Sequence, residues 1–134
     1  MMLAVETATA ACSVAVSDGN KTFFRYSKEP RSQSKKIINM IEDVLEDAAV
    51  SFSMINRLAV TIGPGSFTGL RVGFSVIQGL AFARDLPVVP LCTLEVLAAT
   101  YRRTHIEKTG NGLVISLLNA RMGQCALGGF RWDG

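Results

Sequence analysis

Gly63-Pro64-Gly65-Ser66-Phe67-Thr68-Gly69-Leu70-Arg71 joins the short apolar run 57–62 to a segment that continues without a helix breaker to about Arg84. A strand, a tight turn and a helix are the simplest interpretation of this order. Glycine permits the unusual backbone dihedral angles of a tight turn, and a hydroxyl side chain caps the following helix, with Ser66 and Thr68 as the two candidates. We therefore expect a structural loop made of Gly63, Gly65, Ser66, Thr68 and Gly69.

A phosphate site is the alternative interpretation of this loop. Glycine-rich turns before helices bind phosphate because unhindered backbone N–H groups and the helix N-terminus favour an anion. Here the spacing matches neither G-x-x-x-x-G-K-[ST] nor G-x-G-x-x-G, because no Lys follows the glycines. Pro64 also removes one N–H donor. The pattern therefore favours a turn that orients the helix.

The helix after Thr68 is apolar around most of its circumference. At about 100° per residue, its polar stripe holds only Arg71, Ser75, Gln78 and Asp85. Two adjacent apolar faces remain, one with Gly69, Gly73, Val76 and Leu80, the other with Leu70, Phe74, Ile77 and Ala81. A sheet buries one face well, so we expect the other to contact a neighbouring helix or another subunit. Burial of both faces within one domain is the alternative.

The expected contact surface extends to a second helix, predicted for 33–49 with Ser32 as its N-cap. Met40 and Val44 lie at the edge of this amphipathic helix. Arg71 opposes the positive end of its own helix dipole, so we expect it to pair with an acid across the fold or an interface. The residues expected to bind a partner are Met40, Val44, Arg71, Phe74, Ile77 and Gln78.

The rest of the chain reads as strands around these helices. Runs 3–7, 12–17 and 21–26 predict an antiparallel meander, 86–91 a buried strand, 93–103 a helix capped by Thr93, and 113–118 and 124–130 two further strands. The order β-β-β-α-β-α-β-α-β-β predicts an α/β fold with a mixed five-stranded sheet and helices on its faces. We expect one domain at 1–110, and at 111–134 the start of a second, related domain that is largely absent.

Composition limits the classes of function. Of 134 residues, 49% are apolar and 19% charged, which argues against disorder, and the net charge of +3 does not by itself indicate nucleic-acid binding. Cys12, Cys92 and Cys125 are odd in number and form no C-x-x-C pair, so they suggest neither a disulfide framework nor a zinc site and fit a cytoplasmic protein. No apolar run is long enough to span a membrane. The basic cluster 101–105 could touch RNA phosphate, although a solvated helix end is the simpler interpretation.

Catalytic groups are scarce in this sequence. His105 is the single histidine, and no Ser or Cys lies in a nucleophile motif. A metal pair would need a second histidine or a cluster of acids and thiols. The residues therefore predict no catalytic site and no metal site.

Several stretches together resemble the bacterial TsaB (YeaZ) family. They are Leu3-Ala4-Val5-Glu6-Thr7-Ala8-Thr9, Ala11-Cys12-Ser13-Val14-Ala15, the glycine loop through Val72 and Gly73, Gln78-Gly79-Leu80-Ala81, and Asn119-Ala120-Arg121-Met122-Gly123. The resemblance covers nearly the whole chain and corresponds to the N-terminal half of that family. It implies a ribonuclease-H-like domain of the ASKHA (actin-like and hsp70-like ATPase) superfamily.

The resemblance also implies a function. TsaB proteins are non-catalytic partners of a related subunit, TsaD, and with the ATPase TsaE they support threonylcarbamoylation of adenosine 37 in tRNA. We therefore expect a TsaD-like paralogue and a TsaE-like ATPase as partners, a homodimer when the chain is alone, and only indirect contact with tRNA. ATP and magnesium are expected on the partner subunits, and no cofactor on this chain. The family is also grouped with the glycoprotease-like M22 peptidases.

The first hairpin is where nucleotide-binding relatives hold phosphate and metal. Here it reads Glu6-Thr7-Ala8-Thr9, and Ala8 stands where a glycine would let the backbone approach phosphate. Thr7 and Thr9 still offer hydroxyls, so they are the weak candidates for cofactor binding. Glu6, Gln33, Asn119 and Gln124 also depart from the family pattern. These changes favour a scaffold, and a nucleotide-binding enzyme or a degenerate M22 glycoprotease-like protein remains the alternative.

Overall fold

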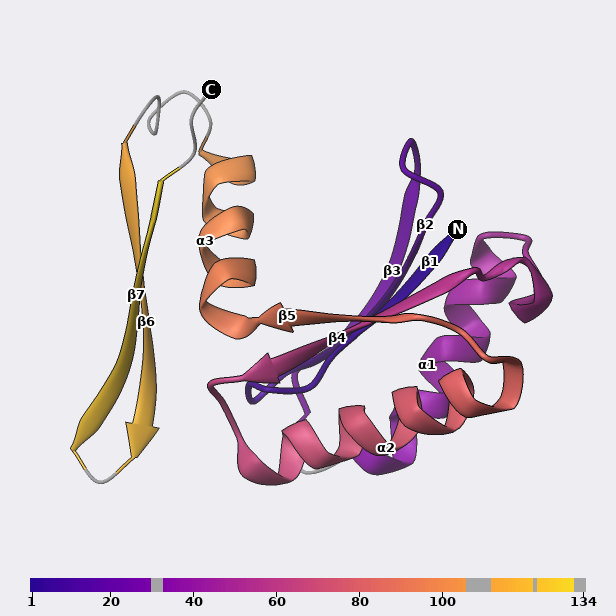
Figure 1. The fold of residues 1–134 in the computed structure, drawn as a ribbon, viewed down its shortest axis with the longest axis horizontal. Coiled ribbons are helices and arrows are strands. Elements are labelled where there is room, and N and C mark those ends of the chain that lie inside the picture. Colours follow the sequence, from indigo (N-terminus) through magenta and orange to yellow (C-terminus); the bar gives the residue numbers. More distant parts are fainter. Residues whose placement is uncertain (30–32, 106–111, 122, 132–134) are drawn as a thin grey trace.

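The computed structural model describes residues 1–29, 33–105, 112–121 and 123–131. A mixed five-stranded sheet has the strand order β3-β2-β1-β4-β5, and a separate two-stranded sheet pairs β6 with β7 (Figure 1). The strands are β1 (Met2–Glu6), β2 (Cys12–Ser17), β3 (Thr22–Ser27), β4 (Arg57–Gly63), β5 (Val88–Cys92), β6 (Leu113–Arg121) and β7 (Gln124–Arg131). The helices are α1 (Gln33–Asp47), η1 (Phe52–Met54), α2 (Phe67–Arg84) and α3 (Thr93–Thr104). The predicted fold class is confirmed.

The first three strands form the predicted antiparallel meander. Leu3 pairs with Val16, and Val16 pairs in turn with Phe23. The turn between β2 and β3 is closed by the Asp18 carboxylate, which accepts hydrogen bonds from the backbone N–H groups of Asn20 and Lys21. β4 then joins β1 in a parallel pair, which makes the sheet mixed.

The hydrophobic core lies between one face of this sheet and the helices α1 and α2. Period-two alternation places every second side chain of β1 and β2 on that face. The two helices contact each other and the strands beneath them. The buried cluster is Leu3, Val5, Cys12, Val14, Val16, Ile37, Met40, Ile41, Val44, Ile55, Leu58, Val60 and Ile77.

The bounds of α1 differ from the prediction at its C-terminal end. The helix ends at Asp47 rather than at 49, because Ala49 has a positive φ of 54° and its N–H donates to the carbonyl of Glu46. Left-handed backbone of this kind ends helices. The predicted N-cap, Ser32, lies outside the described residues.

β5 corrects a second expectation. The sequence predicts a buried strand, whereas Val88, Val89 and Pro90 are exposed. β5 is an edge strand that pairs only with β4 in the described sheet, and an edge position tolerates a proline that cannot donate a backbone hydrogen bond. Thr93 is also not the cap: Cys92 is the N-cap of α3, and Thr93 is its buried first residue.

The β6–β7 hairpin packs against α3, on the side of that helix away from the five-stranded sheet (Figure 1). Its inner face approaches α3 where Gly128 lies beside Leu94. Its outer face exposes four large aliphatic side chains, Leu113, Ile115, Leu117 and Leu127. β6 runs three residues beyond its predicted end at 118. The predicted domain boundary at 110 falls outside the described residues.

Candidate functional site: the first hairpin, the glycine loop and the outer face of α2

The glycine loop is anchored to the turn of the first hairpin. The Ser66 N–H donates to the carbonyl of Ala8 at 2.6 Å, and the Ser66 hydroxyl caps α2 by accepting from the Gly69 N–H at 3.2 Å. Of the two candidate caps, Ser66 is therefore the one used. Gly63 has φ of 111°, which supports its predicted role in the turn. A Cβ on Gly65 would overlap the Ala8 carbonyl oxygen and lie 2.7 Å from the Ala8 Cβ.

Thr7 ties the same hairpin to the helix. Its side chain is fully buried, and its hydroxyl donates to the carbonyl of Gly69 at 2.8 Å. A Cβ on Gly73 would lie 2.5 Å from that hydroxyl oxygen, so the helix packs this closely only because Gly73 has no side chain. Of the two threonines expected to offer hydroxyls to a cofactor, Thr7 therefore has its hydroxyl enclosed and bonded to Gly69.

Glu6 and Thr9 complete the hairpin turn. The Glu6 carboxylate accepts from the Ala8 N–H at 2.7 Å and from the Thr9 hydroxyl at 3.4 Å. Burial raises the pKa of Glu6 above its usual value, and the hydrogen bonds from Ala8 and Thr9 oppose that shift. Glu6 therefore shapes the turn through Ala8, the residue that also receives the glycine loop.

The raised pKa of Glu6 predicts a pH effect on stability. Between the pKa of Glu6 in the unfolded chain and its higher pKa in the folded chain, the folded chain binds more protons. The contribution of Glu6 to the free energy of unfolding therefore falls as pH rises through the folded-state pKa. We expect Glu6→Gln to gain in melting temperature relative to the wild type as pH rises from about 4, the ordinary carboxyl range, to 7. Thermal melts at several pH values measure this. Glu42→Gln makes the same change at an exposed site and serves as the comparison, and a constant offset for Glu6→Gln would contradict the assignment.

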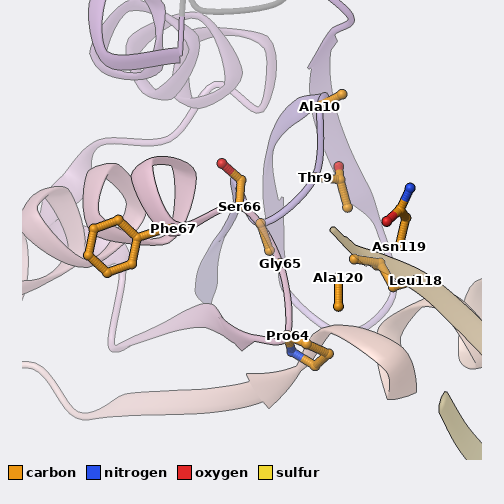
Figure 2. Close-up of a pocket in the computed structure, with 10 residues that line it drawn as sticks. Thr9, Ala10, Pro64, Gly65, Ser66, Phe67, Leu118, Asn119 and Ala120 are labelled. Atoms are coloured by element: carbon orange, nitrogen blue, oxygen red, sulfur yellow. The ribbon is translucent and has the colours of Figure 1, made fainter. Parts of the chain in front are cut away.

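A pocket of ≈560 Å³ opens between this hairpin, the glycine loop and β6 (Figure 2). Figure 2 shows Thr9, Leu118 and Asn119 near one another, with the Phe67 ring away from them. Among the residues that the structure describes, none of those lining the pocket carries a charged side chain; they are Ala8, Thr9, Ala10, Pro64, Gly65, Ser66, Phe67, Leu118, Asn119 and Ala120. Among these described residues, an anion would meet one amide, two hydroxyls and backbone groups.

Three of the six residues expected to bind a partner lie in the core instead. Met40, Val44 and Ile77 are 7%, 0% and 1% exposed. The second apolar face of α2 is therefore covered largely within the chain, by α1 and the sheet, and Phe74 is half-buried against the same core. Of the six expected residues, Arg71 and Gln78 are the ones that the chain by itself exposes.

The exposed stripe of α2 carries two aromatic side chains that the sequence reasoning missed. Phe82 is 94% exposed and Phe67 is 69% exposed. The guanidinium of Arg71 lies 4.0 Å from the centre of the Phe67 ring, so its contact in the described residues is a cation–π pair rather than the expected ion pair. We call Phe67, Arg71, Gln78 and Phe82 the outer α2 face.

Helical spacing could have found these aromatic residues. Positions 67, 71, 78 and 82 follow the i, i+4, i+11, i+15 pattern, which places Phe67 and Phe82 on the stripe already defined by Arg71 and Gln78. Beside it, α1 exposes Ile38 together with acidic side chains such as Glu42 and Asp43. An exposed aromatic stripe flanked by charges is typical of a surface that binds protein.

Potential metal ligands and cysteine thiols lie apart from one another in the part of the chain that the structure describes. No three His, Cys, Asp or Glu side chains there are placed to hold a metal ion. Cys12, Cys92 and Cys125 are free, and burial together with the charge of Glu6 raises the pKa of the Cys12 thiol to about 11. Among the described helices, none combines the length and apolarity needed to cross a membrane.

Comparison with known proteins gives consistent matches. Residues 28–134 match the family described as TsaD, tRNA N6-adenosine threonylcarbamoyltransferase. The chain is 38% identical over 123 residues to the tRNA threonylcarbamoyladenosine biosynthesis protein TsaB of Escherichia coli, covering 92% of this chain and 52% of that protein.

Solved structures agree with the sequence matches. YeaZ from Pseudomonas aeruginosa superposes with a TM-score of 0.90 at 34% identity, covering 98% of this chain and 60% of that one. A second structure, titled as an uncharacterized protein with similarity to peptidase YEAZ from Pseudomonas aeruginosa, gives the same TM-score and identity and is covered to 59%. The chain thus spans about half the length of the curated relatives it matches.

Proposed function

Because this chain belongs to the TsaB (YeaZ) family, with its ribonuclease-H-like ASKHA fold, we propose that it is a non-catalytic partner subunit in threonylcarbamoylation of adenosine 37 in tRNA. In this role it binds a TsaD-like subunit, works with a TsaE-like ATPase in the cytoplasm, and forms a homodimer when it is alone. ATP and magnesium are held by those partners.

The observation that carries this proposal is the outer α2 face. Phe67 and Phe82 expose large aromatic area on a helix that the Ser66 cap and the Thr7 contact hold firmly on the sheet. Aromatic and Arg side chains dominate binding energy at protein interfaces. A rigid helix also loses little conformational entropy on association. Helix pairs from two subunits can therefore pack together here.

Reconstitution tests the proposed function. A TsaD relative, a TsaE relative, ATP, magnesium, threonylcarbamoyl donor and unmodified tRNA are combined with and without this chain. We expect tRNA modification, measured by mass spectrometry of the nucleosides, only when the chain is present. Modification at the same rate without it would contradict the proposal.

A nucleotide-binding role is the second candidate, and the pocket beside Thr9 and Asn119 is the observation in its favour. The pocket has the volume for a small ligand. The described part of its lining contains no Lys or Arg, the Ala8 carbonyl already accepts from the Ser66 N–H, and the Thr7 hydroxyl is enclosed. These described residues would therefore offset little of the negative charge of a bound phosphate.

Calorimetry distinguishes these two roles. We expect no heat of binding when ATP and magnesium are titrated at micromolar concentration into the chain alone, because none of the described lining residues is a cation that would offset the phosphate charge. A stoichiometric low-micromolar isotherm that is lost in Asn119→Leu would establish the nucleotide role instead.

The outer face of the β6–β7 hairpin also belongs to this proposal. A two-stranded sheet is rarely stable by itself, and Leu113, Ile115, Leu117 and Leu127 would stay in contact with water. The curated relative from Escherichia coli is about twice as long as the matched stretch, and we propose that the hairpin begins a second domain whose remainder covers this face.

A further inference from the structure

Exposed charges on α1 and α2 oppose the dipoles of their own helices. Arg71 lies near the N-terminus of α2, where the helix dipole disfavours a cation. Glu46 lies in the last turn of α1, where the dipole disfavours an anion, and Glu42 lies one turn before it. All three residues are exposed. Helix stability therefore does not explain these charges.

The three charges lie on the outside of one helical layer, because α1 and α2 cover the same face of the sheet. At about 100° per residue, Glu42 and Glu46 lie about 140° and about 180° around α1 from buried Ile37. By the same spacing, Arg71 lies about 120° around α2 from buried Ile77. The charges thus point away from the sheet.

Arg71 and Glu46 mark opposite ends of this layer. α1 connects β3 to β4 and α2 connects β4 to β5, and these three strands are parallel to one another. Two crossover helices between parallel strands run in the same direction, back along the sheet. The layer therefore carries a cation near its N-terminal end and two anions toward its C-terminal end.

Within the described residues, none of these three charges belongs to an ion pair; the pairs found there are Arg25–Asp47 and Lys36–Glu29. Arg71 instead contacts the Phe67 ring on the outer α2 face. A surface with opposite charges at its two ends is complementary to a copy of itself that is turned end for end. The same surface also carries exposed Phe82, which offers apolar contact area.

We propose that a second copy of the chain binds this surface in antiparallel orientation, so that Arg71 of each copy meets Glu42 and Glu46 of the other. A two-fold axis that crosses the helices obliquely makes this contact twice. An axis along the helices would instead bring the two Arg71 ends together, and like charges across an interface disfavour that orientation. The inference rests on the homodimer of the proposed function and adds its orientation and the charges that fix it.

Charge exchange tests this pairing. Sedimentation equilibrium of the chain alone gives the dimer dissociation constant for the wild type, Arg71→Glu, the pair Glu42→Arg with Glu46→Arg, and all three changes combined. We expect Arg71→Glu and the glutamate pair each to weaken the dimer at least about tenfold, since each places like charges opposite one another. The combined variant restores the opposite charges and should return to within about threefold of the wild type.

Arg103→Glu is the matched control, because it makes the same charge change at an exposed site on α3, away from α1 and α2 (Figure 1). It should leave the dimer unchanged. Thermal melts should show all variants folded, since every changed side chain is exposed.

Three results would overturn the inference: a wild-type chain that stays monomeric, a combined variant that dimerises as weakly as Arg71→Glu, or an equal loss in Arg103→Glu. Arg71→Glu that weakens only the complex with a TsaD relative would assign Arg71 to that subunit and overturn it too. The proposed role in tRNA modification is tested separately, because reconstitution with the wild-type chain requires no homodimer.

Discussion

Gly65→Ala is expected to lower the free energy of unfolding by about 3 kcal/mol and the melting temperature by roughly 10 °C. The added Cβ would overlap the Ala8 carbonyl oxygen, and the atoms that must separate are backbone atoms of two anchored turns. Separation also lengthens the 2.6 Å hydrogen bond from Ser66 to Ala8. Chemical and thermal unfolding followed by circular dichroism measure the effect.

Gly79→Ala is the matched control for this prediction. The same substitution on exposed α2 surface meets no atom within 4 Å. Alanine in a helix interior is favoured over glycine, so we expect this variant to gain about 0.5–1 kcal/mol. Two variants with the same chemical change should thus shift stability in opposite directions. Equal stability of Gly65→Ala and wild type would refute the close contact between loop and hairpin.

Phe82→Glu is expected to weaken the complex with a TsaD relative by about 100-fold while the fold is retained. Phe82 is 94% exposed, so the substitution costs little in the free chain. In the proposed complex it would remove an aromatic side chain and place a charge in an apolar contact. Size-exclusion chromatography with light scattering, and calorimetric titration, measure the loss. The homodimer of the chain alone should weaken in parallel.

Phe24→Glu is the control for the partner interface. Phe24 is also a largely exposed phenylalanine, on β3 and on the opposite face of the sheet from α1 and α2. We expect wild-type affinity in this variant. By contrast, Met40→Glu or Ile77→Glu would place a charge in the core and unfold the chain, so loss of binding in those variants would carry no information about the interface.

Local pattern predicted most of the fold correctly. Alternation at Leu3, Val5 and Val14 gave the meander, and the glycine loop gave a strand-to-helix turn before α2. The predicted end of α1 was wrong because a single backbone conformation decides it. Ala49 has a positive φ, which residue propensities do not predict. The burial of β5 was predicted wrongly because its Val-rich sequence suits a central strand. Its position at the edge of the sheet depends on the whole topology, which the local sequence does not contain.

The candidate site was harder to predict than the fold. Both faces of α2 beside Ile77 are apolar, so periodicity alone could not say how much of the helix the chain itself buries. Contacts between distant segments decided it, chiefly Thr7 against Gly73 and Gly65 against Ala8. The same contacts enclose the Thr7 hydroxyl. The sequence alone does not distinguish this hydroxyl from that of Thr9, which is less buried.

Site-specific photo-crosslinking tests most directly the central claim that the outer α2 face binds the TsaD-like subunit. A benzophenone amino acid replaces Phe82 in one preparation and Phe24 in another, and each is irradiated with the TsaD relative under conditions where the complex forms. The account predicts a covalent product with TsaD from position 82 and none from position 24. A product from position 24 alone, or none from either position while the complex is intact, would contradict it.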